Sequence, residues 1–171
     1  IPLGVYGLIG QLVALGGAYA FSRDQERDAD RIGVQLMRTA GYDTREAAGT
    51  IIVDTNGRHL YFVLPGKRAY AYPISVGREG FEWTGTERIS RIASWPSWTP
   101  PPEMHKRQPG LPITVTGGLL NPQGARALYL GNTIYRIHGT NNDRTVGRAN
   151  SSGCFRLKNA HVVHLATIAR V

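Results

Sequence analysis

The sequence predicts a mainly β fold that begins near Gly49 and is preceded by a helical segment. From this residue onward the apolar residues alternate with a period of two, which is typical of strands. Before it, apolar residues recur at helical spacing between an N-cap at Ser22 and a glycine that follows the helix, Gly41. The change of period predicts two units, a helical segment over residues 1–48 and a β domain over residues 49–171.

The predicted β domain opens with a hairpin. Its strands cover residues 50–55 and 58–64 and flank Asn56-Gly57, because an Asn-Gly pair readily adopts the positive φ angles of a type I′ turn. A run rich in Gly, Pro and Trp over residues 77–110 predicts an ordered loop that lines a groove. Further elements are predicted as strands over residues 68–76, 113–115, 127–130 and 133–137 and as a short amphipathic helix over residues 159–171.

Residues 1–21 carry no charged side chain. A secretory leader that ends near Ala18-Tyr19-Ala20 and a membrane span are both open interpretations of such a run. However, no basic segment precedes it, and Gln11 and five glycines dilute its hydrophobicity. We therefore favour a buried or interfacial helix here, with membrane association through residues 1–21 as the less favoured alternative.

The chain of 171 residues carries a formal net charge of +8, with 20 Lys and Arg against 12 Asp and Glu. A basic surface of this kind favours anionic partners. Nucleic acid is the first candidate, but the basic residues are scattered, their longest run is His105-Lys106-Arg107, and no nucleic-acid-binding motif accompanies them. We therefore expect no nucleic-acid partner. The 42% of hydrophobic residues indicates a packed globular chain.

Cys154 is the one cysteine of the chain, so no intrachain disulfide forms. It lies in the polar run Ser151–Arg156, 16 residues after His138, which ends a predicted strand. A lone cysteine is often an inert buried residue, and a lone histidine is often part of a satisfied core. Two serines and a glycine before Cys154 favour a turn with exposed backbone over a core position. This context predicts a thiol nucleophile paired with His138.

The chemistry of such a pair follows from the residue types. The thiolate attacks a carbonyl, so we expect the charge of Arg156 and the His138 imidazole to lower the pKa of Cys154. His138 takes the thiol proton and returns it to the leaving amine. Backbone N–H groups of Ser152, Gly153 and Cys154 are predicted to bind the oxyanion, and Gly153 permits the tight turn that this requires.

The same residues resemble the signature of the YkuD-type L,D-transpeptidases of bacterial cell walls, over residues 49–171. The resemblance rests on Tyr135–Thr140, Ser151–Leu157, Asn159, Ser75–Gly80 and Asn121–Leu128. It implies a β-sandwich or β-barrel catalytic domain with a short C-terminal helix. The family domain usually continues past that helix into a further strand, so we expect one sheet edge of this chain to lack a partner.

The resemblance also implies an activity. Cys154 and His138 form an acyl-enzyme from the tetrapeptide stem of peptidoglycan, release D-Ala and transfer the acyl group to an amine, while the carbonyl of Gly139 orients the imidazole. Acidic stem carboxylates suit a protein of charge +8. The acceptor stays open between another stem, water, a D-amino acid and the lysine of an outer-membrane lipoprotein. The implied location is the periplasm or cell envelope, with no cofactor and no metal.

Substrate contacts are expected from Arg156, Ser151, Trp98 and Thr140. Trp98 belongs to the Gly- and Pro-rich loop, and Thr140 closely follows the predicted base. For Arg156 two roles are open. It either anchors a substrate carboxylate and supports the thiolate, or it pins its own loop by hydrogen bonds to carbonyls, and we favour the second role.

Residues 1–48 resemble part of the membrane-associated zinc metallopeptidases of the HtpX kind, on the run Phe21–Gly33. The resemblance implies that Glu26 is a zinc ligand and that Asp30 supports a ligand histidine. The HExxH helix that supplies the other two ligands is missing, since the first histidine is His59, and catalytic zinc needs three protein ligands. We therefore interpret this segment as a peptidase fragment without a metal site.

Three functional hypotheses follow from the sequence. The leading one is a cysteine transpeptidase, the second is a cell-wall-binding module with an inactive site, and the third is a remnant zinc metallopeptidase. A reactive Cys154 would support the transpeptidase, and an inert Cys154 would support the binding module. Stoichiometric bound zinc would support the metallopeptidase. The oligomeric state and the role of residues 1–48 stay open at this point.

Overall fold

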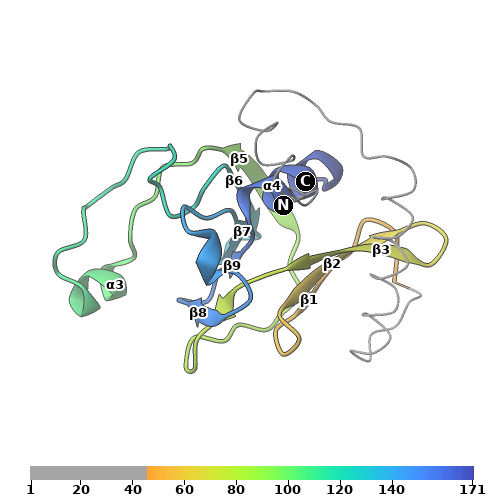
Figure 1. Ribbon diagram of the computed structural model, residues 1–171, viewed down its shortest axis with the longest axis horizontal. Coiled ribbons are helices and arrows are strands. Elements are labelled where there is room, and N and C mark those ends of the chain that lie inside the picture. The colour runs from red at the N-terminus through yellow and green to blue at the C-terminus, as the bar shows by residue number, and fades with distance from the viewer. Residues whose placement is uncertain (1–45) are drawn as a thin grey trace, which may run out of the picture.

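The computed structural model describes residues 46–171 (Figure 1), and the predicted helix that ends at Gly41 lies outside them, as do Glu26 and the uncharged run 1–21. The described part is mainly β with a short C-terminal helix, as predicted, and it holds no helix long and apolar enough to cross a bilayer.

The elements follow in the order β1 Ile51–Asp54, β2 His59–Leu64, β3 Arg68–Pro73, β4 Val76–Gly77, β5 Ile89–Ser94, α3 Pro102–Arg107, β6 Arg126–Leu130, β7 Arg136–His138, the 3₁₀ helix η1 Asp143–Thr145, β8 Ala149–Ser151, β9 Phe155–Arg156 and α4 Asn159–Ile168.

β1, β2 and β3 form an antiparallel sheet in this order. The β1–β2 pairing ends with Asp54 opposite His59, so the predicted hairpin is confirmed. Its turn differs from the prediction, because residues 55–58 connect the strands and the positive φ of 56° falls on Arg58. The Asp54 carboxylate accepts a hydrogen bond from the Gly57 N–H (2.9 Å). The connection is therefore a longer loop and not a two-residue type I′ turn.

The strand predicted over residues 68–76 is interrupted at Pro73. β3 ends at this proline, whose ring nitrogen has no hydrogen to donate to a ladder. The chain then changes partner. Ile74 donates its N–H to the carbonyl of Arg58 (2.9 Å), and β4 pairs in parallel with β8 in a separate two-stranded sheet. The structure therefore has two strands where the sequence predicted one.

The third sheet has the order β5-β6-β7-β9. β5, β6 and β7 pair antiparallel, whereas β7 and β9 run parallel, with His138 opposite Arg156. A parallel pair needs a crossover connection, and residues 139–154 supply it with η1 and β8. The crossover begins just after His138 and ends at Cys154. His138 therefore ends one strand of this pair, and Cys154 directly precedes the other.

One core joins the first sheet, the third sheet and α4, which packs on β6 and β7. The predicted final helix is confirmed, and its apolar residues Val162 and Leu165 are buried. Burial of each large apolar side chain contributes about 1.5–3 kcal/mol to stability. β7 and β9 contribute Ile137 and Phe155 to this core, so the core holds both strands in place. Its other buried members are Leu60, Phe62, Tyr72, Ile74, Val76, Leu128, Leu130, Ile137, Phe155 and Leu157.

The segment between β5 and β6 differs most from the prediction. Residues 113–115 form no strand, and Val115 makes a single bridge to Trp98. Inside the Pro-rich run, α3 begins with Pro102 at its first position, where the missing N–H costs no helical hydrogen bond. The buried Asn121 anchors this long loop. Its amide nitrogen lies 3.0–3.1 Å from the carbonyl oxygens of Pro96, Val115 and Thr116.

Asn159, the first residue of α4, connects two chain segments that flank the third sheet. Its Oδ1 accepts hydrogen bonds from the N–H groups of Ala125 (2.9 Å) and Thr140 (3.3 Å), and its Nδ2 donates to the Thr140 carbonyl (2.9 Å). Gly124 and Gly139 lie so close that a Cβ at either position would be 2.2 Å from this oxygen. Asn159 therefore clamps the backbone at the end of β7.

Replacing Asn159 by alanine should lower the free energy of unfolding by about 2 kcal/mol, because three backbone groups lose their hydrogen-bond partner. Asn159→Asp keeps the two accepted hydrogen bonds and should cost less. Urea denaturation of both variants beside the unmodified chain measures the difference. Equal stability of Asn159→Ala and the unmodified chain would contradict the clamp.

Candidate active site

His138 ends β7 and is buried, with 5% of its surface exposed. Its Nδ1 lies 2.6 Å from the carbonyl oxygen of Gly139, the next residue. A carbonyl only accepts hydrogen bonds, so Nδ1 carries the proton, and Nε2 presents a lone pair when the ring is neutral. The backbone that supplies this carbonyl is the one that Asn159 clamps.

Burial lowers the pKa of His138 to about 3. The charge of Arg156 also lowers this pKa, the hydrogen bond to Gly139 opposes the change, and the charge of Arg136 adds a smaller lowering. The ring is therefore neutral at neutral pH. A neutral imidazole with a free lone pair is the form that a general base requires.

Cys154 is half-buried and directly precedes β9. Its thiol lies 4.0 Å from the carbonyl oxygen of Ile134. Phe155 and its strand partner Ile137 face the core. Because side chains alternate along a strand, the residues on either side of this pair face away from the core. His138 therefore faces away from the core, and Cys154 directly precedes the neighbouring strand.

Burial raises the pKa of the Cys154 thiol. The backbone N–H of Arg136 and the charges of Arg136 and Arg156 favour the thiolate and lower this pKa, but the effect of burial is larger. The prediction that this pKa is lowered is wrong, because the desolvation of a buried anion cannot be read from neighbouring residue types. With His138 neutral as well, the resting site holds an uncharged thiol and an uncharged imidazole.

The turn before Cys154 is held by Ser151, which is fully buried. The Ser151 hydroxyl donates to the carbonyl of Cys154 (2.6 Å) and accepts the N–H of Gly153 (3.1 Å). Gly153 has a φ of +107°, and a Cβ there would lie 2.5 Å from the ring of Tyr135, so only glycine fits. The Ser151 hydroxyl, which was expected to contact substrate, is therefore occupied by these two hydrogen bonds. The Gly153 N–H, one of the predicted oxyanion donors, is occupied as well. The N–H groups of Ser152 and Cys154 remain as candidate donors.

Two other expected substrate contacts have structural partners. Thr140 is buried, and its hydroxyl accepts the N–H of Asn142 (3.1 Å), which shapes the loop after β7. Trp98 is half-buried in the long loop, where its backbone pairs with Val115 at 2.8 Å in both directions. The substrate contacts of Thr140 and Trp98 stay predictions.

Arg156 is partly buried on β9, and its backbone pairs with Ser75 at 2.8 and 3.1 Å. Its side chain acts on Cys154 and Arg78 through its charge. Within residues 46–171 no carbonyl accepts a hydrogen bond from the guanidinium, so the loop-pinning role that we favoured from the sequence is not observed. The other role of Arg156, with its charge effect on the thiolate and its contact with a substrate carboxylate, stays a prediction.

Two further residues that shape the site were not predicted. Arg136 lies two residues before His138 on β7, and the alternation of strand side chains places it on the same face. That signal was present in the sequence. Asn159 was noticed only as part of a motif, and its role became visible in three dimensions because its partners lie 19 and 34 residues away.

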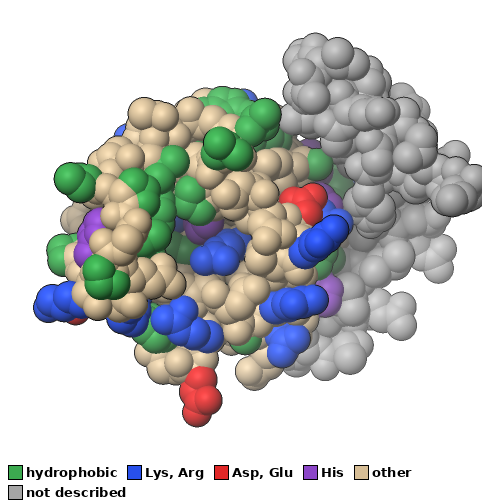
Figure 2. Space-filling view, turned by 60° about the vertical axis from the view of Figure 1, so that its left-hand side comes forward, with side chains coloured by type: hydrophobic (Ala, Val, Ile, Leu, Met, Phe, Trp, Pro, Cys, Tyr) green, Lys and Arg blue, Asp and Glu red, His purple; other side chains and the backbone are tan. Residues whose placement is uncertain are grey.

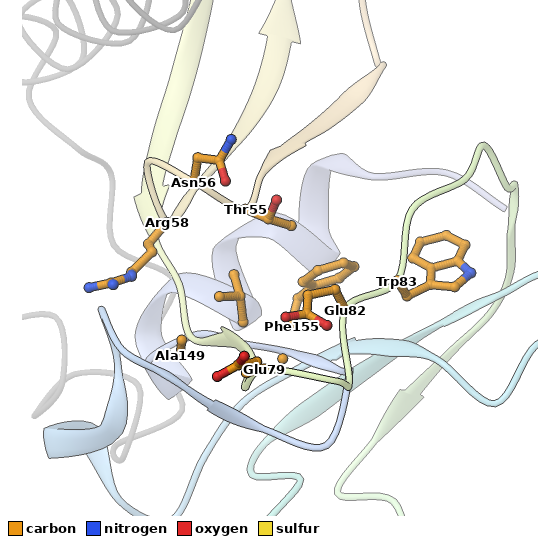
Figure 3. Close-up of a pocket in the computed structure, with 10 residues that line it drawn as sticks. Thr55, Asn56, Arg58, Glu79, Glu82, Trp83, Ala149 and Phe155 are labelled. Carbon is orange, nitrogen blue, oxygen red and sulfur yellow. The ribbon is translucent and has the colours of Figure 1, made fainter.

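A pocket of about 320 Å³ lies beside the candidate site (Figure 3). It meets the site through Phe155, which follows Cys154, and through Trp83, whose ring centroid lies 5.1 Å from that of Tyr135. Cys154 and His138 do not line it. The lining residues are Thr55, Asn56, Arg58, Val76, Gly77, Glu79, Glu82, Trp83, Ala149 and Phe155.

Comparison with known sequences identifies relatives of this site. The profile of the YkuD family, described as the L,D-transpeptidase catalytic domain, matches residues 48–171. The probable L,D-transpeptidase ErfK/SrfK of Escherichia coli (strain K12) is 36% identical over 124 residues, which is 67% of this chain and 39% of that protein. The probable L,D-transpeptidase YbiS of the same strain gives the same identity over 40% of its length. The chain therefore spans about two fifths of these relatives.

Solved structures share the fold. A Brucella melitensis protein described as a probable carnitine operon oxidoreductase is 38% identical, with a TM-score of 0.53 over 75% of this chain and 85% of that one. L,D-transpeptidase 3 from Mycobacterium tuberculosis, in complex with a faropenem-derived adduct, gives a TM-score of 0.56 over 72% of this chain and 57% of that one. At 11% identity the second likeness concerns the fold alone.

These relatives give no support to the metallopeptidase resemblance of residues 1–48, most of which lie outside the described residues. From residue 46 onward, no three His, Cys, Asp or Glu side chains come together as metal ligands. The family profile and the relatives cover the segment that carries Cys154 and His138. The chain belongs to the YkuD family of L,D-transpeptidase catalytic domains.

Proposed function

We propose that residues 49–171 are the catalytic domain of a peptidoglycan L,D-transpeptidase, distinct from a segment over residues 1–48, and that it acts in the periplasm. The observation that carries the proposal is the neutral, buried His138. Its Nδ1–H is held by the Gly139 carbonyl, and it lies on the strand next to the one that Cys154 precedes. The substrate is the tetrapeptide stem of peptidoglycan.

The first half-reaction forms a thioester. Nε2 of His138 takes the proton of the Cys154 thiol while the sulfur attacks the carbonyl carbon of the third residue of the stem. The bond from this carbon to the nitrogen of D-Ala breaks, and the proton moves from the imidazolium to the departing amine. An acceptor amine then attacks the thioester and forms a new amide, and the proton it loses passes through His138 to the sulfur. A second stem and a lipoprotein lysine are both acceptors of this kind.

The charges that develop during the reaction have partners in the turn and on the strands. The N–H groups of Ser152 and Cys154 bind the oxyanion, and each such donor typically contributes about 3 kcal/mol to transition-state stabilisation. Arg136 and Arg156 stabilise the thiolate as it forms. Because the resting thiol is uncharged, the two arginines interact with the sulfur most strongly once its proton leaves. They therefore stabilise the transition state more than the ground state and lower the activation free energy.

A second candidate function is a cell-wall-binding module without catalysis. One observation favours it, namely the raised pKa of Cys154, since a thiol that stays protonated is a poor nucleophile unless a base removes its proton. Release of D-Ala separates the two candidates, because only the transpeptidase cleaves the stem.

Cys154→Ala should reduce D-Ala release from tetrapeptide stems by at least about 10³-fold, since the acyl-enzyme cannot form. Mass spectrometry of muropeptides incubated with each protein measures the release, and circular dichroism checks that the variant is folded. Undiminished release by folded Cys154→Ala would exclude a cysteine mechanism, and no release by the unmodified chain would favour the binding module.

The rate of alkylation of Cys154 by iodoacetamide should rise with pH up to pH 9 without a plateau near neutrality. The thiolate is the reactive form, and burial raises the thiol pKa above its ordinary value of 9.0. Below that pKa, each pH unit increases the thiolate fraction about tenfold. Intact-protein mass spectrometry reports this one cysteine alone. A rate that is constant between about pH 5 and 8 would indicate a thiolate–imidazolium pair instead.

A further inference from the structure

Two arginines from distant parts of the chain meet on one aromatic ring. The guanidinium carbon of Arg78 lies 4.2 Å from the ring centroid of Phe81, and that of Arg107, on α3, lies 4.8 Å from the same centroid. Both are within cation–π distance. The two guanidinium groups are therefore no further apart than the sum of these distances, close enough for both to act on one anionic ligand.

This arginine pair is fixed next to the turn that carries Cys154. The backbone N–H of Arg78 donates to the carbonyl of Ser151 (3.1 Å), and the N–H of Phe81 donates to the carbonyl of Arg78 (2.9 Å). The Phe81 carbonyl packs against Gly153, where a Cβ would lie 3.2 Å from its oxygen. The charge of Arg78 also acts on Arg156, so the pair continues the positive potential of the candidate site outward.

No carboxylate of the described residues neutralises the pair. From residue 46 to residue 171 the one salt bridge joins Lys106 to Glu103, at 3.3 Å. Glu79, next to Arg78 in the sequence, lines the neighbouring pocket. The Phe81 ring accepts no strong hydrogen bond, so the N–H groups of both guanidinium groups stay available to a ligand. The face of the molecule drawn in Figure 2 carries several Lys and Arg side chains and few acidic ones.

We propose that Arg78 and Arg107 form a binding site for free carboxylates of the peptide substrate, beside Cys154. The proposal rests on the proposed function for the identity of the peptide. A guanidinium binds a carboxylate through two parallel N–H bonds, and Phe81 holds both groups in place before the peptide arrives. The site therefore selects acidic stems over stems whose carboxylates are amidated.

The test measures binding without turnover. The 171-residue chain with Cys154→Ala is titrated calorimetrically, at constant salt, with a stem tetrapeptide that has free carboxylates and with the same peptide amidated at those carboxylates. We expect amidation to weaken binding about tenfold or more, as the loss of charge-assisted hydrogen bonds predicts. Adding Arg78→Gln and Arg107→Gln should weaken binding of the acidic peptide to the level of the amidated one.

Arg91→Gln is the matched control. The Arg91 guanidinium lies 3.9 Å from the ring centroid of Tyr129, so this change removes the same charge from the same type of contact elsewhere in the chain, on β5. It should preserve the preference for the acidic peptide. Equal binding of both peptides, binding of neither, or an equal loss in Arg91→Gln would overturn the proposal. D-Ala release by the unmodified chain is a separate assay, so the proposed function is decided independently.

Discussion

The hydrogen bond from Nδ1 of His138 to the carbonyl of Gly139 is the constraint on which the candidate site depends. It assigns the proton to Nδ1 and leaves the Nε2 lone pair for a substrate or a thiol proton. The position of the carbonyl depends in turn on Asn159, which holds the next residue, Thr140, from both its N–H and its C=O. Since Asn159 begins a helix that packs in the core, the geometry of the base is tied to the hydrophobic core of the domain.

Burial and positive charge act in opposite directions on the thiol and in the same direction on the imidazole. Burial keeps both groups neutral, while Arg136 and Arg156 favour the thiolate and disfavour the imidazolium. A site of this kind stores no ion pair at rest. Its positive charges stabilise the sulfur as it becomes anionic. The proposed contacts of Arg78 and Arg107 with carboxylates extend this positive potential to the substrate.

The sequence was sufficient where the signal is local. The hairpin of β1 and β2 and the helix α4 follow from periodicity, and Cys154 and His138 follow from residue chemistry. β5 was not predicted, because its burial does not alternate regularly and its pairing with β6 contains a register shift. Three features could not be predicted, because they depend on contacts or burial that only the folded chain creates. They are the clamp at Asn159, the hydrogen bonds of the Ser151 hydroxyl within its own turn, and the raised pKa of the Cys154 thiol.

Nitrogen-15 NMR of the His138 imidazole across a pH range reports which ring nitrogen carries the proton and when the second one is protonated. We expect one protonated nitrogen, assigned to Nδ1, and an unprotonated Nε2 from neutral pH down to about pH 5, because the pKa of His138 in the folded chain is about 3. A ring protonated on both nitrogens at pH 6, or a proton on Nε2 in the neutral ring, would contradict it.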